Sequence, residues 1–313
     1  MERMEKDDVV TGAAPGSQVS GSRGLFLSRV VRNEPLCREH FRLVLEVDDF
    51  PPAAPGQFVQ ILCAEPNELG WTQGAFIRRP FSIGGLRRGG RRCELDILYR
   101  ALGTGTRWLS RQRKGEPVSV LGPLGRPFEI HADREIAWLV GGGIGLPPLI
   151  WLAQTLSAAG RRAVAFCGAR SADFMPLTRV AGVEIVGEQP VLAFEEFASV
   201  GVPVITATDD GSLGAAARVP DVFARYLDQH AGQISSAAIY ACGPEPMIRA
   251  TAQIGLAHGI PTAVCLERVM ACGMGTCQSC VVRVHDAAAE EGWRYRLCCT
   301  DGPVFDAREV VWD

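Results

Sequence analysis

The sequence lacks a strong excess of charge of either sign. Its 313 residues include 32 lysines and arginines against 35 aspartates and glutamates, which gives a formal net charge of −3. Proteins that bind nucleic acid normally concentrate positive charge, so this balance argues against such a partner. The sequence also has no internal repeat and no low-complexity linker. Because 47% of the residues are hydrophobic, the chain has ample apolar material for a core, and its length allows two or three domains.

The first residues lack the apolar stretch of a signal peptide. Residues 1–23 are charged or small and polar, and we expect them to form a disordered tail, not a targeting segment. No membrane span is expected either. The uncharged stretch from Ile136 to Gly160 is long enough to cross a bilayer, but its five glycines and two prolines favour a buried strand, a glycine turn and an apolar helix.

Most of the cysteines lack the regular spacing of a disulfide framework. Scattered cysteines are typical of reduced thiols, so we expect a cytoplasmic protein. Six of the eleven cysteines are of this kind: Cys37, Cys63, Cys93, Cys167, Cys242 and Cys265.

Near the C-terminus the cysteines follow the pattern C-x4-C-x2-C with a distant fourth. This spacing is typical of the loop that holds a plant-type 2Fe-2S cluster. Gly273 and Gly275 would let the backbone curl so that its amides point at the sulfurs. The predicted cluster ligands are Cys272, Cys277, Cys280 and Cys299.

Other interpretations of these cysteines stay open. A structural zinc site usually pairs two C-x2-C knuckles, and only Cys277 and Cys280 form one here. Disulfides and scattered buried thiols are further alternatives. The fourth ligand is ambiguous, because Cys298 and Cys299 are adjacent and their side chains would point in different directions. We favour Cys299.

The pattern of apolar runs predicts a multidomain protein with three regions. Residues 24–131 contain short alternating runs such as FRLVLEV and CELDILYRA, which indicate an antiparallel β-barrel. Residues 132–259 alternate apolar runs (IAWLVGGG, AVAFCGA, VEIVG, VPVITAT, AAIYACGP) with helical stretches, which indicates an α/β doubly wound parallel sheet. Residues 260–313 form a small, cysteine-rich C-terminal 2Fe-2S domain.

Two motifs of the first region resemble the flavin site of the ferredoxin-reductase family. The first is the RPFS strand, and LYRALGTGT follows it some twenty residues later. Alone, RPFS could be an edge strand whose arginine is only solvated. The resemblance implies that Arg79 contacts the FAD pyrophosphate, that the aromatic residue lies against the isoalloxazine ring, and that Ser82 is a catalytic residue near the hydride-accepting nitrogen. A guanidinium suits a diphosphate in both charge and geometry. The implied FAD-binding residues are Arg79, Pro80, Phe81, Ser82, Leu98, Tyr99, Arg100, Gly103, Gly105 and Thr106.

The second region carries a glycine turn at which a helix N-terminus could hold a phosphate. The turn, LVGGGIGLPPLI, departs from the G-x-G-x-x-G fingerprint because Leu146 replaces its third glycine. It resembles the nicotinamide-binding half of the same family, as does the later CGP motif. In that family the CGP cysteine lies where nicotinamide and flavin meet, so the resemblance makes Cys242 the second catalytic residue; alone, it would be a buried thiol. The implied NAD(H)-binding residues are Gly141, Gly142, Gly143, Gly145, Cys242, Gly243 and Pro244.

The choice between NAD and NADP stays open. Arg170 could contact a 2′-phosphate, whereas Asp173, Asp209 and Asp210 could accept a hydrogen bond from a ribose hydroxyl. With either nucleotide, the three sites form a sequence of electron carriers. A nicotinamide exchanges two electrons as hydride, a cluster accepts one electron at a time, and FAD does both.

The order of motifs narrows the resemblance further. RPFSI, CGPEPM, ERVMACGMGTCQSC and DGPVF are similar to the electron-transfer subunits of the NAD-dependent class of dihydroorotate dehydrogenase. That family implies a partner, an FMN-containing catalytic subunit that oxidises dihydroorotate to orotate in pyrimidine biosynthesis, in a hetero-oligomer of heterotetramer type. Electrons would pass through the cluster and FAD to NAD.

Three departures keep other functions open. The segment around residues 64–77 and the spacing between Cys280 and Cys299 are longer than the family pattern, and a tail of about twenty residues precedes the barrel. One alternative is a flavin and iron-sulfur reductase subunit of another complex, such as a hydrogenase, sulfide dehydrogenase or NADH:ferredoxin enzyme. A second is a redox-sensing binding module that regulates a partner without turnover.

Overall fold

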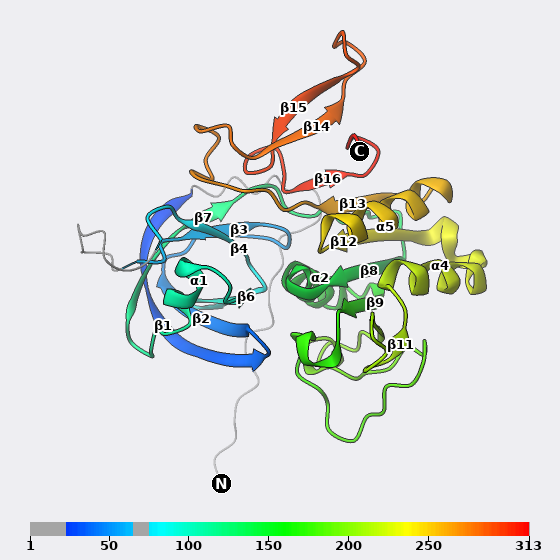
Figure 1. Ribbon diagram of the computed structural model, residues 1–313, viewed down its shortest axis with the longest axis horizontal. Coiled ribbons are helices and arrows are strands. Elements are labelled where there is room, and N and C mark those ends of the chain that lie inside the picture. The colour runs from blue at the N-terminus through cyan, green and yellow to red at the C-terminus, as the bar shows by residue number, and fades with distance from the viewer. Residues whose placement is uncertain (1–22, 65–74, 313) are drawn as a thin grey trace.

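The computed structural model describes residues 23–64 and 75–312. Nearly all of the tail expected over residues 1–23, and most of the segment around residues 64–77, lie outside the described residues. Two seven-stranded sheets stand side by side, and a two-stranded hairpin lies at one end of the molecule (Figure 1). In the described part of the chain, no helix is long and apolar enough to span a membrane.

The first sheet is antiparallel and curls on itself, as predicted for the barrel region. Its strand order is β4-β3-β7-β1-β2-β6-β5. The two edge strands, β4 and β5, follow one another in the chain, so the curled sheet is nearly closed. Between them, Ile83 N donates to Gln57 O (3.1 Å) and Gly84 N donates to Asp96 O (2.8 Å). The strands are β1 Gly24–Cys37, β2 His40–Asp48, β3 Phe58–Ile61, β4 Arg79–Ser82, β5 Gly85–Gly89, β6 Arg92–Arg100 and β7 Pro117–Leu124, with helix α1 Thr104–Leu109 before β7.

The second sheet confirms the doubly wound α/β prediction. Its order is β11-β10-β9-β8-β12-β13-β16, and all neighbours are parallel except β13 and β16. Alternate residues of β8 face opposite layers: Leu139 packs in the cluster that contains helix α2, whereas Trp138 packs against Phe223 of helix α4. The elements are β8 Ile136–Gly142, α2 Leu146–Ala158, β9 Arg162–Ala169, α3 Glu195–Ala198, β10 Val204–Thr208, β11 Ala215–Ala216, α4 Val219–Gln229, β12 Ala237–Cys242, α5 Glu245–Ala257, β13 Thr262–Cys265 and β16 Val304–Asp306.

One apolar run predicted as part of this alternation does not form a strand. The VEIVG segment, residues 183–187, is irregular, and β10 pairs directly with β9. Gly182 (φ 77°) precedes the run and Gly187 (φ 58°) ends it, and their left-handed conformations interrupt an extended ladder. Val183 and Ile185 still pack against the core, whereas Val186 is 66% exposed. The run therefore contributes to packing without joining the sheet.

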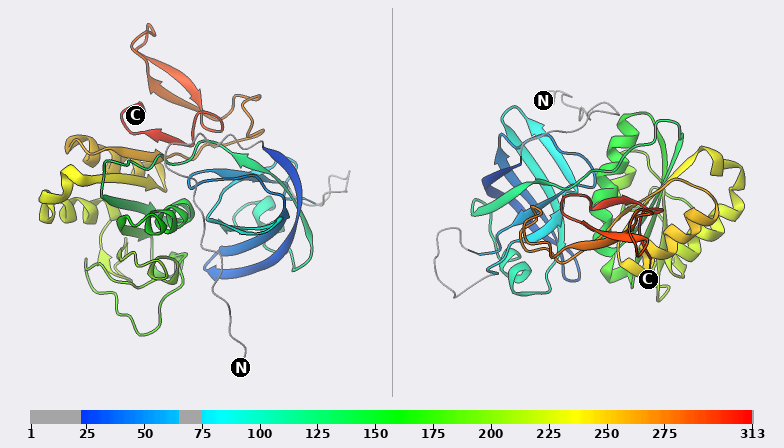
Figure 2. Two further views of the ribbon diagram at one scale, coloured as in Figure 1. Left: turned by 180° about the vertical axis from the view of Figure 1, so that it is seen from behind. Right: turned by 90° about the horizontal axis from the view of Figure 1, so that it is seen from above.

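The cysteine-rich segment is an excursion from the second sheet. β13 begins two residues after position 260, where we expected the third region to start, and β16 returns to pair with it in antiparallel register. The hairpin β14 Val281–His285 and β15 Trp293–Leu297 lies between these two strands in the sequence. Seen from above, the orange segment lies across the boundary between the barrel and the parallel sheet (Figure 2). Both sheets thus border the cysteines.

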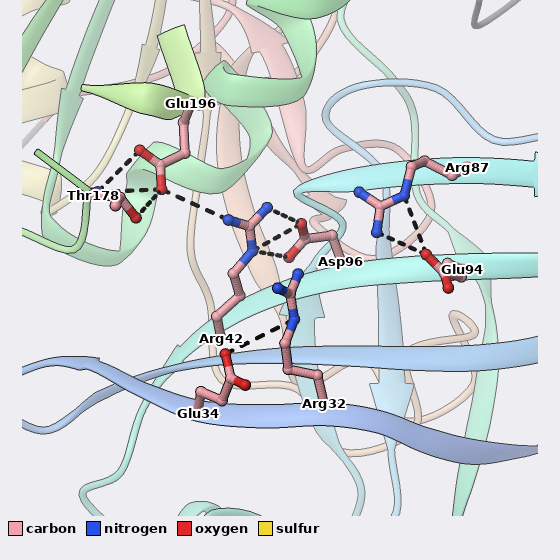
Figure 3. Close-up of polar contacts among 8 residues, drawn as sticks. All are labelled: Arg32, Glu34, Arg42, Arg87, Glu94, Asp96, Thr178 and Glu196. Carbon is pink, nitrogen blue, oxygen red and sulfur yellow. Dashed lines mark hydrogen bonds and ion pairs between the residues drawn. The ribbon is translucent and has the colours of Figure 1, made fainter. Parts of the chain in front are cut away.

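Apolar and ionic contacts join the barrel to the parallel-sheet domain. Trp151 of α2 packs in the barrel core, and Leu98 of β6 packs in the core of the other domain. Arg42 of β2 forms ion pairs with Asp96 of β6 and with Glu196 of α3 (Figure 3). These contacts fix one domain against the other and so fix the shape of the space between them.

Candidate functional site at the boundary of the two sheets

A cavity of about 880 Å³ lies between the barrel and the carboxyl ends of the parallel strands. The ends of β8, β9, β12 and β13 all reach it, which is where ligands bind in open α/β sheets. Leu266 and Met270 extend its lining into the cysteine-rich segment. Many of the residues predicted to bind flavin or nicotinamide meet here: Pro80, Phe81, Ser82, Leu98, Arg100, Gly142, Gly143, Gly145, Cys242, Gly243 and Pro244.

Strand alternation separates the predicted flavin residues of β6. Leu98 and Arg100 line the cavity, whereas Tyr99 points into the barrel core. The Tyr99 ring stacks on Phe41 at 5.6 Å, and its hydroxyl donates to Asn33 Oδ1 at 3.0 Å. Burial raises the pKa of Tyr99 above its ordinary value, so the hydroxyl stays protonated. Tyr99 supports β4 through the T-shaped contact of its ring with Phe81, without lining the cavity.

The predicted phosphate contacts of the barrel do not line this cavity. Arg79 is exposed, and its guanidinium donates to Ile77 O at 2.7 Å. Thr106 Oγ1 accepts from the backbone amides of Leu102 and Gly103 at the start of α1. A Cβ at Gly105 would lie 2.8 Å from the Ala75 Cβ, so this glycine is needed for packing. Of these residues, only Arg79 has a charged group facing solvent and able to meet a phosphate.

The two glycine motifs of the parallel sheet lie in direct contact, although about one hundred residues separate them in the sequence. A Cβ at Gly145 would lie 2.4 Å from Cys242 O and 2.4 Å from Gly243 N, so no larger residue fits. Gly143 adopts a left-handed φ of 52° at the tip of the turn. Gly141 does not line the cavity, because Leu146 and Leu149 of α2 cover it. Together the two turns form a floor of backbone at the ends of β8 and β12.

Cys242 lies buried in this floor. Its register partner on β13 is Cys265, and both line the cavity. The neighbouring Cys242 thiol, together with burial, raises the pKa of Cys265 well above its ordinary value. Cys265 therefore remains a neutral thiol at physiological pH.

The cavity rim carries both signs of charge. Arg170 and Asp209, which we considered for nucleotide recognition, line it, whereas Asp173 and Asp210 do not. Asp173 pairs with Arg38 at 3.3 Å, and Asp210 accepts from Ser212 N at 3.0 Å. Sequence reasoning missed several lining residues. Met270 lies in the recognised ERVMACGMGTCQSC motif but was given no role, and the others lie in no motif that we recognised: His40, Phe58, Phe174 and Arg218. Three guanidinium groups surround the Phe174 ring at 5.0–5.7 Å, those of Arg38, Arg100 and Arg170.

The C-terminal cysteines form two pairs. Cys277 N donates to Cys272 Sγ, and Cys299 N donates to Cys280 Sγ, each at 3.4 Å. Met274 N is also 3.4 Å from Cys272 Sγ. The loop can curl in this way because Gly273 (φ 69°) and Gly275 (φ 90°) are left-handed.

This arrangement fits a 2Fe-2S cluster. Such a cluster takes four thiolates, two on each iron, and backbone amides directed at the sulfurs stabilise its charge. Hydrogen bonding, first to the Ser279 side chain, lowers the pKa of the exposed Cys277 to about 6, whereas burial raises the pKa of Cys299 to about 12.

The adjacent Cys298 points elsewhere. Its side chain is fully buried, and its Sγ donates to Leu266 O at 3.3 Å. Burial raises the pKa of this thiol far above its ordinary value. The hydrogen bond to Leu266 joins the hairpin end to the segment that follows β13.

The chain is similar to solved structures of oxidoreductases. The structure from a study of flavin-based electron bifurcation, an NADH-dependent reduced ferredoxin-NADP oxidoreductase, aligns with a TM-score of 0.69 and 25% identity, over 91% of this chain and 90% of that one. A ferredoxin reductase of carbazole 1,9a-dioxygenase aligns with a TM-score of 0.59 and 19% identity, over 76% of this chain and 67% of that one. Fold and cavity thus define a ferredoxin-reductase-like protein.

The sequence relatives are more specific. The family described as "Iron-sulfur cluster binding domain of dihydroorotate dehydrogenase B" matches residues 267–311. The electron transfer subunit of dihydroorotate dehydrogenase B (NAD(+)) from Geobacillus sp. (strain WCH70) is 37% identical over 90% of this chain and 96% of its own length. The subunit from Desulforamulus reducens is 33% identical over 83% of this chain and 88% of its own. The chain belongs to the family of dihydroorotate dehydrogenase B (NAD(+)) electron transfer subunits.

Proposed function

We propose that this chain transfers electrons from a partner subunit, which oxidises dihydroorotate to orotate with FMN, to NAD in pyrimidine biosynthesis. The observation that carries this proposal is the cavity whose lining combines the RPFS strand, the CGP turn and the cysteine-rich segment. Family membership supports the identity of the substrate and the partner. When bound, FAD exchanges two electrons with NAD(H) and single electrons with a 2Fe-2S cluster.

In this proposal the residues of the chain bind and orient the carriers. Pro80, Phe81 and Ser82 of β4 would hold the flavin ring, while Arg79 would leave its present carbonyl partner for the pyrophosphate. The backbone floor of Gly142–Gly145 and Cys242–Pro244 would seat the nicotinamide half. The buried Cys242 and the half-buried Met247 would exclude water from the place where hydride is exchanged. No residue of this chain is required as a general acid or base.

The cluster would be held by Cys272, Cys277, Cys280 and Cys299. Exposed apolar side chains of this segment include Val269, which is 86% exposed, and Met274, which is 39% exposed. Exposed apolar side chains next to the cluster suit docking by a second protein, because burying them is favourable and brings the carriers close. We infer that this face meets the catalytic subunit in a hetero-oligomer, in the cytoplasm.

The test uses the purified chain and its complex. Adding NADH without oxygen should bleach the flavin absorbance within seconds and then reduce the cluster. Co-expression with the FMN subunit of the same family should give a stable complex that forms orotate from dihydroorotate and reduces NAD. A flavin that NADH does not reduce would refute electron transfer. A complex that transfers electrons from another donor, but not from dihydroorotate, would refute only the substrate assignment. The same assay with NADPH addresses the choice of nucleotide.

A further inference from the structure

The side chain of a buried glutamine between the barrel and the cysteine loop has no hydrogen-bond partner among the described residues. Gln60 of β3 is fully buried, and within residues 23–64 and 75–312 neither Nε2 nor Oε1 of its side chain has a partner. A buried carboxamide without partners costs free energy, because it has given up its bonds to water. Retaining such a group in a well-packed region indicates that another group bonds to it in the functional state.

The alternation of β3 directs this side chain out of the barrel. Val59 and Ile61 pack in the barrel core, whereas Phe58 packs among the cysteine-rich segment on the other face. Gln60 shares the face of Phe58. There it meets Gly273, the residue after Cys272: a Cβ built on Gly273 would lie 2.8 Å from Gln60 Nε2. The amide nitrogen thus lies against the cysteine loop.

The backbone of Gln60 is held by β4, the strand of the RPFS motif that we assign to flavin binding. Gln60 pairs with Pro80 across β3 and β4, within the RPFS motif. Its carbonyl also accepts from Arg78 Nη1 at 3.3 Å. One residue therefore connects the strand assigned to flavin to the loop assigned to the cluster, and its position is fixed from the flavin side.

We propose that the Gln60 side chain donates a hydrogen bond from Nε2 to a sulfur of the cluster and so sets the reduction potential of that cluster. This inference rests on the proposed function. No described residue accepts a hydrogen bond from Gln60 Nε2, whereas a thiolate or sulfide of the bound cluster can accept one, and hydrogen bonds to the sulfurs tune iron-sulfur potentials. Reduction adds negative charge to the cluster, so a donor at its sulfur favours the reduced form.

The chain offers a matched control in the neighbouring buried glutamine. Gln57 donates from Nε2 to Gly125 O (2.7 Å) and accepts at Oε1 from Ala54 N (3.0 Å), so its carboxamide is satisfied. Replacing each glutamine by methionine keeps the side-chain length and removes the amide. Gln57→Met should lower the Tm of the cluster-free protein, whereas Gln60→Met should not, because it removes an unsatisfied group.

The deciding experiment is a redox titration of the cluster followed by EPR. In Gln60→Met the midpoint potential should become more negative, so that the ratio of reduced to oxidised cluster at a fixed poise falls about tenfold, which corresponds to about 59 mV for one electron. Gln57→Met should keep the wild-type value. Gln60→Asn retains the carboxamide but shortens the side chain, which moves the amide away from the cluster. Its midpoint potential should therefore shift in the same direction as that of Gln60→Met.

The outcomes separate this inference from the proposed function. A wild-type protein without a 2Fe-2S signal would refute the function and, with it, the inference. A normal wild-type cluster whose potential is the same in both Gln60 variants would overturn the inference alone. Loss of the cluster from both variants, while they remain folded, would also overturn it, because a donor that adjusts the potential is not needed for assembly.

Discussion

Arg42 and Glu196 face each other across the boundary between the barrel and the parallel-sheet domain. Arg42 Nη1 lies 3.7 Å from Glu196 Oε1, and the Glu196 side chain is only 3% exposed. Thr178 donates its backbone amide and its hydroxyl to the same carboxylate (Figure 3). On its other side, Arg42 pairs with the buried Asp96. A single guanidinium therefore compensates two buried carboxylates from different domains.

We predict that Arg42→Met strongly destabilises the protein. Removing the cation leaves the Asp96 and Glu196 carboxylates buried without their counter-charge, a change that costs about 3–5 kcal/mol. Thermal and urea denaturation measure the loss. The control is Arg91→Met, which breaks the exposed ion pair with Asp49 and should leave the unfolding midpoint unchanged. Equal midpoints for the two variants would contradict the role assigned to Arg42.

The adjacent cysteines should respond differently to substitution. Cys299→Ser should abolish the 2Fe-2S absorbance and EPR signal, since the amide of Cys299 bonds Cys280 Sγ and its thiol adjoins the other cysteines of the loop. Cys298→Ser should keep the cluster, because its side chain bonds Leu266 O and a serine hydroxyl can do the same. Iron content per chain gives an independent measurement. The reverse result would make Cys298 the ligand.

Two neighbouring arginines should separate ligand binding from stability. Arg79→Ala should weaken FAD binding by roughly 10- to 100-fold, the effect of one lost charge-assisted hydrogen bond, without changing the Tm of the flavin-free protein. Arg78→Ala should instead lower that Tm, because its guanidinium donates to Ser119 O (3.0 Å) and Ser119 Oγ (2.8 Å). Flavin titration and thermal denaturation measure the two effects. Stoichiometric, tightly bound FAD in Arg79→Ala would refute its role.

The protein should become less stable as the pH falls below 6.5, because the pKa of His40 is lowered in the folded state. Burial is the main cause that lowers the pKa of His40 from the ordinary value of 6.5. Between the lowered native pKa and 6.5 the unfolded chain binds more protons than the folded chain, so protonation favours unfolding. The stability contributed by neutral His40 is thus complete above pH 6.5 and declines below it.

Substitution can isolate this effect. His40→Gln removes the titrating group and should flatten the dependence of Tm on pH between about 7 and 5, although the variant loses packing. The control is His258→Gln at an exposed position, which should retain the wild-type slope. An unchanged slope in His40→Gln would assign the acid sensitivity to another group.

The sequence predicted those parts of the structure that depend on local patterns. Alternating runs predicted the antiparallel strands, and glycine turns after apolar runs predicted the ends of β8 and β12 at the cavity. The strand predicted at VEIVG does not form, because such an apolar run can pack against a core without pairing in a sheet. The left-handed glycines Gly182 and Gly187 prevent the pairing here. The return of β16 to β13 could not be predicted, since this pairing joins residues about forty positions apart.

The residues at the boundaries between domains illustrate the same limit. Arg42, Glu196 and Gln60 lie in no motif, and their roles arise only when separate domains meet. Motif reasoning also grouped Tyr99 with Leu98 and Arg100, although adjacent residues of a strand face opposite sides. The alternation in LYR would have allowed this distinction from the sequence.

The cysteine-rich segment leaves the second sheet at β13 and returns to it at β16, so both of its ends are anchored in one rigid layer. The hairpin β14–β15 can then gain or lose residues at its tip without displacing the cysteines at its base, because lengthening a surface loop costs little. The fold therefore tolerates insertions and deletions at the hairpin tip. The outer surface of the molecule can change to bind a different partner protein, while the positions of the electron carriers beneath it stay the same.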